Sequence, residues 1–92
     1  IKASMFFDLS YARRNNASER LRILVSEDCG VSYPHVLFDQ SGDLIAVENN
    51  NTAWQPQNEG DWRNEFVVLN NFAGKDQVRV AFVVTNDNGN NL

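Results

Sequence analysis

The sequence predicts an all-β domain, built as an antiparallel β-sandwich. Apolar and polar residues alternate in several short runs, and clusters of turn-forming residues separate these runs. No stretch keeps the apolar spacing of an amphipathic helix for long enough to predict one. Because 92 residues can enclose one hydrophobic core and no more, we expect residues 1–92 to form a single domain.

The first strands are expected at 4–12 and 21–25. In each of these runs the apolar side chains fall at alternate positions, which is typical of a half-buried strand. The apolar positions are Met5, Phe7, Leu9 and Tyr11 in the first run, and Leu21, Ile23 and Val25 in the second. The polar segment 13–18 between the two runs is expected to be a loop.

The rest of the chain predicts four more strands, separated by turns and one long loop. Pro34 precedes a short run at 35–39, and the turn-forming cluster 40–43 leads into another at 44–47. Segment 48–61 is rich in Asn, Gln and Pro, so we expect a long loop there. Strands at 65–69 and 77–85 follow, the second with its inner face formed by Val78, Val80, Phe82 and Val84, and a turn is expected at 86–91.

Composition excludes several classes of partner. The net charge is −4 and the arginines are dispersed, so we expect no binding to nucleic acid or to anionic lipid. No apolar run reaches the length of a membrane-spanning helix, so no membrane insertion is expected. Both ends of the sequence read as excised from a longer polypeptide, which would supply the export signal and further domains.

A turn motif follows the second predicted strand. Segment 26–33 fits the pattern Ser-x-Asp-x-Gly-x-Ser-aromatic, known as an Asp box in sialidase-type propellers. Its expected role is structural, with Ser26 and Asp28 bonding the backbone of the turn and Gly30 supplying a positive φ. The chain is far too short for a propeller and its substrate-binding arginines, so a glycosidase is not expected.

Catalysis is not expected from this chain. Cys29 and His35 are its only cysteine and histidine, and a thiolate mechanism would also need an orienting group and an oxyanion site. Two such residues are too few for a zinc site. Calcium is harder to dismiss, because carboxylates occur in several predicted loops and strand ends, and Asp8 and Asp87 are the candidate ligands.

Aromatic residues provide the candidate binding groups. Trp54 with Gln55 in the long loop, and Tyr33 after the turn motif, are the residue types that contact sugars. Trp62 stands directly before a predicted strand, so we expect it to be a buried anchor.

Five segments together resemble the choice-of-anchor J family. Its members are MAM-like jelly-roll modules found in secreted multidomain proteins of Bacteroidetes. The segments are 7–12, 21–30, 61–63, 70–74 and 86–92. The resemblance implies a jelly-roll sandwich, concanavalin-like or galactose-binding-like, without catalytic residues of its own. It also implies a parent that is in some cases a metalloprotease or other hydrolase, and a final strand beyond Leu92.

These observations predict a noncatalytic, extracellular accessory module of a secreted or cell-surface bacterial protein. Its role would be adhesion, weak binding of a glycan or cell-surface protein, or structural support beside the other domains of the same polypeptide. A dedicated carbohydrate-binding module attached to a secreted hydrolase or protease is the alternative.

Overall fold

The structure, a computed structural model, describes residues 2–87 and shows an all-β domain, as predicted. Within these residues the only helical segments are three single 3₁₀ turns, and none is long and apolar enough to cross a membrane. The strands are β1 (Ser4–Leu9), β2 (Ala12–Arg13), β3 (Arg20–Ser26), β4 (His35–Ser41), β5 (Glu48–Asn49), β6 (Arg63–Val68) and β7 (Arg79–Thr85). The turn expected at 86–91 and any strand beyond it lie mostly or wholly outside the described residues.

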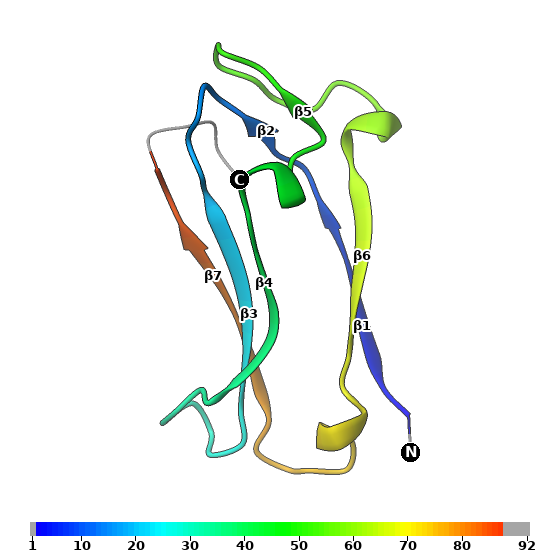
Figure 1. The fold of residues 1–92 in the computed structure, drawn as a ribbon. Coiled ribbons are helices and arrows are strands. Elements are labelled where there is room, and N and C mark those ends of the chain that lie inside the picture. Colours follow the sequence, from blue (N-terminus) through cyan, green and yellow to red (C-terminus); the bar gives the residue numbers. More distant parts are fainter. Residues whose placement is uncertain (1, 88–92) are drawn as a thin grey trace.

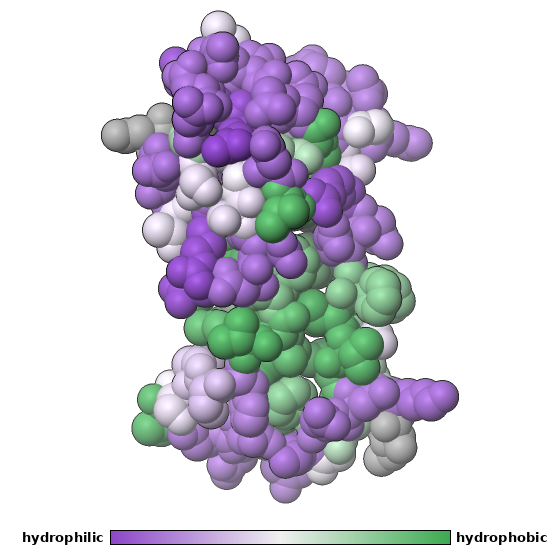
Figure 2. All heavy atoms as spheres, in the orientation of Figure 1, coloured by the Kyte–Doolittle hydropathy of each residue, from purple (hydrophilic) through white to green (hydrophobic). Residues whose placement is uncertain are grey.

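The strands form three separate sheets (Figure 1). The largest has the order β4-β3-β7, and both of its pairings are antiparallel. The second consists of β1 and β6, also antiparallel, with Phe6 opposite Phe66. The short strands β2 and β5 pair in parallel at the end of the molecule that Figure 2 shows covered by hydrophilic side chains.

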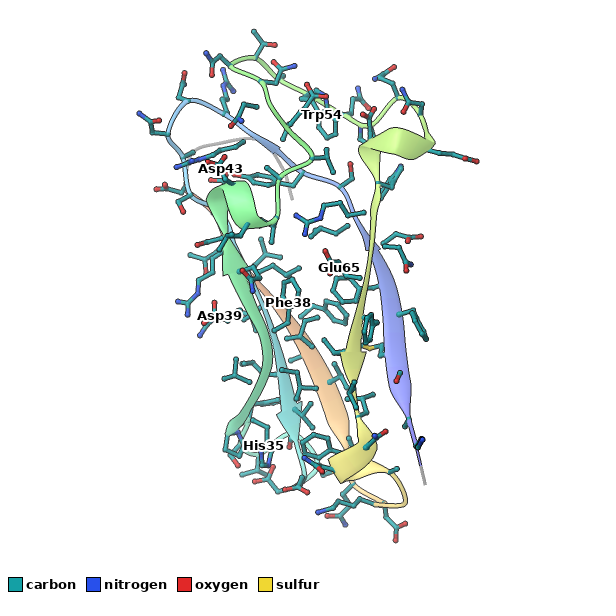
Figure 3. The ribbon with its side chains drawn as sticks, turned by 45° about the vertical axis from the view of Figure 1, so that its right-hand side comes forward. His35, Phe38, Asp39, Asp43, Trp54 and Glu65 are labelled. Carbon is teal, nitrogen blue, oxygen red and sulfur yellow. The ribbon has the colours of Figure 1, made fainter. Side chains whose placement is uncertain are left out.

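The two larger sheets face one another through aromatic side chains. The ring of Phe7 on β1 meets Phe38 on β4 and Phe82 on β7 edge to face, with centroids 5.7 and 5.6 Å apart. Phe38 and Phe82 flank Ile23 of the central strand on either side. Phe7 therefore lies over β3, and Figure 3 shows Phe38 projecting into the space between the sheets.

The core lies beneath this contact, along β3 and the end of β1. As predicted, Leu21, Ile23 and Val25 share one face of β3, and all three are buried. The main cluster joins residues from three separate segments, namely Leu9, Tyr11, Leu21 and Ile45, with Phe7, Phe38 and Ala46 packed against it. Burial of this apolar surface is the main stabilising contribution.

Two of the predicted strands are wrong, one in kind and one in extent, and the loop expected at 48–61 contains the short strand β5 and a 3₁₀ turn at Glu59–Asp61. The strand expected at 44–47 is a 3₁₀ turn at Gly42–Leu44, because Gly42 has a φ of +56° and its carbonyl accepts the amides of both Ile45 and Ala46. The strand expected at 4–12 ends at Leu9. Beyond it the carbonyl of Tyr11 accepts the amide of Val47, so the chain changes its pairing partner.

The inner face predicted for β7 exists, but it is poorly covered. The two-stranded sheet β1-β6 faces the three-stranded sheet β4-β3-β7. Since β1 lies above β3 and β6 lies close to β4, no strand of the described chain lies above β7. As a result, Phe82 is 49% exposed and Val84 is 45% exposed, although both point to the same side as buried Ile23 and Leu21.

Candidate functional site

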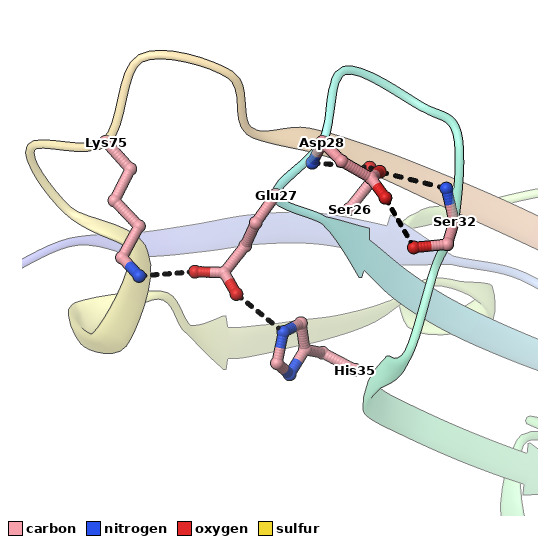
Figure 4. Close-up of polar contacts among 6 residues, drawn as sticks. All are labelled: Ser26, Glu27, Asp28, Ser32, His35 and Lys75. Carbon is pink, nitrogen blue, oxygen red and sulfur yellow. Dashed lines mark hydrogen bonds and ion pairs between the residues drawn. The ribbon is translucent and has the colours of Figure 1, made fainter.

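The turn after β3 is organised by hydrogen bonds from Ser26 and Asp28. The Ser26 hydroxyl donates to Asp28 Oδ1 (2.6 Å) and accepts the amides of Asp28 (3.2 Å) and Gly30 (2.9 Å). Asp28 in turn accepts both the amide and the hydroxyl of Ser32 (2.9 and 2.6 Å; Figure 4). Cys29 and Gly30 both have positive φ, +63° and +90°, which reverses the chain. The hydroxyls of Ser26 and Ser32 lower the pKa of Asp28 to about 2.

Beside this turn, Glu27 contacts two side chains from other segments, Lys75 and His35. Its carboxylate accepts from Lys75 Nζ and lies 2.9 Å from His35 Nε2 (Figure 4). The hydrogen bond from Lys75, followed by that from His35, holds the pKa of Glu27 below its usual range. The His35 ring also packs against Phe72, with centroids 5.0 Å apart. The cluster ties the turn to β4 and to the loop before β7, which is a structural role.

The thiolate arrangement that an enzyme would need is not assembled among the described residues. The Cys29 thiol is exposed and its hydrogen-bond partner is the Arg79 guanidinium at 3.4 Å, while the His35 ring is occupied by Glu27. A nucleophile and its base must lie within hydrogen-bond reach of one another. The geometry therefore gives no support to a mechanism through Cys29 and His35.

The predicted sugar-binding residues are not brought together. Trp54 lies near one end of the molecule and His35 near the other (Figure 3). The Tyr33 hydroxyl lies beside Gly30, in the turn that precedes His35. Trp54 and Tyr33 are both partly exposed, and Gln55 is exposed. One ligand of modest size would not contact both rings.

The predicted calcium ligands are also not brought together, since Asp8 lies on β1 and Asp87 follows the end of β7. Asp8 accepts a hydrogen bond from Asn64 Nδ2 (3.2 Å), and Asp87 accepts the amide of Ser18 (2.7 Å). Within residues 2–87 no group of three or more His, Cys, Asp or Glu side chains is arranged to hold a metal ion. Calcium needs six to eight oxygen ligands.

Trp62 was expected to be a buried anchor, and this prediction is wrong, because its side chain is 48% exposed. The indole borders a pocket of about 320 Å³ between β1 and β7. The pocket is lined mainly by apolar side chains, and two polar residues, one on β1 and one just after it, complete the lining. The lining residues are Phe7, Asp8, Leu9, Ser10, Leu21, Trp62, Phe82 and Val84. Apolar pockets with a few polar groups are the usual sites of ligand binding.

The position of Trp62 follows from how its neighbours are held. The Ser10 hydroxyl donates to the carbonyl of Asp61 at 2.7 Å, which fixes the backbone before Trp62 against the end of β1. Arg63, the next residue, pairs with Leu9 and points inward, donating to the carbonyl of Leu44 at 2.7 Å. Because side chains alternate along a strand, Trp62 points to the opposite side.

A second feature missed from the sequence is a buried pair, Tyr11 and Glu19, both fully inaccessible. The Tyr11 hydroxyl donates to Glu19 Oε1 (2.5 Å), and Glu19 Oε2 accepts the amide of Asp87 (2.8 Å). Burial, together with the hydrogen bond to Glu19, raises the pKa of Tyr11 to about 12. The pair joins the loop before β3 to the residues after β7.

No family model, curated protein or solved structure matches this chain. The pocket beside Trp62 is the candidate functional site because of its apolar lining and the exposed indole at its border.

Proposed function

We propose that this chain is a noncatalytic binding module of a larger secreted or cell-surface polypeptide, and that its ligand occupies the pocket beside Trp62. The observation that carries the proposal is a half-exposed indole over an apolar pocket in a small domain. Trp is the residue type most enriched where proteins bind their partners, since its ring buries a large area and keeps a polar N–H.

The sequence supports the extracellular setting and the finer fold. The five segments that resemble the choice-of-anchor J family favour a jelly-roll sandwich, and two facing antiparallel sheets are compatible with one. Cys29 and His35 have other partners, Arg79 and Glu27, which favours binding over catalysis. Such a module would attach its parent protein to a glycan or to another protein's surface.

A dedicated carbohydrate-binding module is the second candidate. Asp8 and Ser10 line the same pocket as Trp62, so an exposed ring lies beside a carboxylate and a hydroxyl. Sugars bind where an aromatic face meets their C–H groups and polar side chains meet their hydroxyls.

Tryptophan fluorescence tests both forms of the proposal, because the chain has two tryptophans, which can be removed one at a time. In a Trp54→Phe variant, Trp62 is the only indole, and a ligand in the pocket should shift its emission saturably. In the matched Trp62→Phe variant, the same ligand should give no shift. The titrants are soluble plant and microbial polysaccharides and short peptides.

A shift confined to the Trp62→Phe variant would place binding at Trp54 and contradict the proposed site. Absence of any shift in either variant, across all titrants, would contradict a binding role and leave structural support as the function.

A further inference from the structure

We propose that the ligand of this pocket is an extended polypeptide strand, which pairs antiparallel with the free edge of β1 and covers β7. This inference rests on the proposed binding function and names its partner. It commits to a separate peptide segment whose inward side chains are apolar and whose outward side chains include a cation.

The backbone of β1 directs hydrogen-bonding groups away from β6. The carbonyl of Ala3 accepts the amide of Leu69 at 2.8 Å, so the groups of Ala3 point toward β6. Backbone groups alternate in direction along an antiparallel strand. Those of Phe6 and Asp8 therefore point away from β6, to an edge that no strand of residues 2–87 occupies. A row of such groups is a template for another strand.

The pocket runs along this edge of β1. Four consecutive residues of β1 and its end line it, from Phe7 to Ser10, and its floor is formed by Leu21, Phe82 and Val84. A strand beside β1 would be positioned above β7 at the spacing of facing sheets, about 10 Å. Its inward side chains would cover Phe82 and Val84, which are half-exposed without it.

The charge of the pocket favours a cationic residue on the added strand. Asp8 is the one charged residue among those that line the pocket, and it stands on the outward face of β1. The residue directly opposite Asp8 on an added strand would share that face. A lysine or arginine there would complement the carboxylate, while the positions on either side of it would carry apolar residues facing inward. This alternation describes an extended peptide better than a sugar or a compact apolar molecule.

The test uses the whole chain with the Trp54→Phe substitution and the peptide acetyl-Val-Thr-Val-Lys-Val-Thr-Val-amide. We expect a saturable change in the emission of Trp62. In the proposed pairing the amides of Thr and Lys face β1 and those of Val face solvent. N-methylation of the Thr and Lys amides should weaken binding by about tenfold or more. N-methylation of the two inner Val amides should change it little, and replacing Lys by Glu should weaken it at low salt.

A matched pair of protein variants locates the contact. Val84 in the pocket and Val68 on the outer face of β6 are 45% and 50% exposed. Val84→Glu should weaken peptide binding by about tenfold or more, because it buries a charge, whereas Val68→Glu should leave it unchanged. Both variants change an exposed residue, so both should fold.

Equal binding of the two methylated peptides, or equal effects of the two glutamate variants, would overturn the proposal. So would a dimer in sedimentation that Val84→Glu dissociates and the peptide does not displace, because a second copy would then occupy the groove. A shift of Trp62 with a polysaccharide but not with the peptide would overturn this inference and leave the proposed binding function standing.

Discussion

Strands β3 and β7 are neighbours in one sheet with similar alternating patterns, yet they differ sharply in burial. Ile23 and Val25 on β3 are fully buried, while Phe82 and Val84 on the same face of β7 are almost half exposed. The difference comes from the opposite layer, where Phe7 of β1 lies over β3 and only the edge of its ring reaches Phe82, so no strand within residues 2–87 covers β7. Alternation thus predicts which face a side chain occupies, and the second layer decides whether that face is covered.

The two strands therefore contribute differently to the domain. β3 contributes stability, since it is paired on both sides and buried beneath β1. β7 contributes apolar surface to the pocket beside Trp62. Substitutions on the two strands should therefore separate stability from binding.

The largest effect is expected from Ile23→Ala at the centre of β3. The side chain is fully buried between Phe38 and Phe82, so its truncation should lower the free energy of unfolding by about 2–5 kcal/mol. Equilibrium denaturation with urea measures this change. A loss below about 1 kcal/mol would show that β3 is not the centre of the core.

Tyr11→Phe should have the second-largest effect on stability, because it leaves the buried side chain of Glu19 without one of its hydrogen-bond donors. The expected cost is about 1–3 kcal/mol of unfolding free energy. The partly exposed Tyr33 offers a matched control, and Tyr33→Phe should cost less.

The same residue has a signature at high pH. The pKa of Tyr11 is about 12 in the fold against an ordinary 10.0, so the unfolded chain releases this proton first as pH rises. Its stabilising contribution is complete below pH 10 and should be lost progressively between pH 10 and 12. Thermal melts of the native chain and Tyr11→Phe should show a difference that shrinks over this range.

Asp28→Asn should lower the melting temperature by several degrees at neutral pH, since the carboxylate holds Ser26 and Ser32 in the turn. The pKa of Asp28 is about 2 in the fold against an ordinary 3.8. The advantage of the native chain is therefore present above pH 3.8 and lost as pH falls toward 2. Melting curves at pH 2 to 6 measure it, and a constant difference across that range would contradict the assigned role.

The smallest effect on stability is expected from Val84→Ala on β7. The side chain is already 45% exposed, so the loss should stay below about 1 kcal/mol. Peptide binding by the same variant should weaken measurably. A stability loss equal to that of a matched Val25→Ala variant, which removes a fully buried side chain, would contradict the contrast between the strands.

The sequence predicts the strands with strong alternation and fails where long-range contacts decide. The faces of β3 and β7 follow from spacing alone. The run at 44–47 looks like a strand, but Ile45 is a single buried anchor after a 3₁₀ turn, because the Gly42 carbonyl captures two amides. A short apolar run does not distinguish the two outcomes.

The candidate site was harder to predict than the fold. Trp62 read as an anchor because it precedes a strand, but the next residue, Arg63, takes the inward position and donates to the carbonyl of Leu44, while Trp62 is 48% exposed. Glu19 falls between the predicted loop at 13–18 and the predicted strand at 21–25, and its burial depends on Tyr11 and the amide of Asp87, which is 68 positions away in the chain. The local spacing of apolar residues does not indicate contacts between residues that are far apart in the chain.

Amide hydrogen exchange along β1, followed residue by residue by NMR, tests most directly whether its free edge and β7 form one binding surface. In the free protein, the amide of Asp8 should exchange rapidly and that of Phe7, in a hydrogen-bonded pair with Glu65, should be protected. With saturating peptide, exchange at Asp8 should slow by about tenfold or more, with Phe7 little changed. Protection of Asp8 before any peptide is added, or unchanged exchange at saturation, would contradict the account.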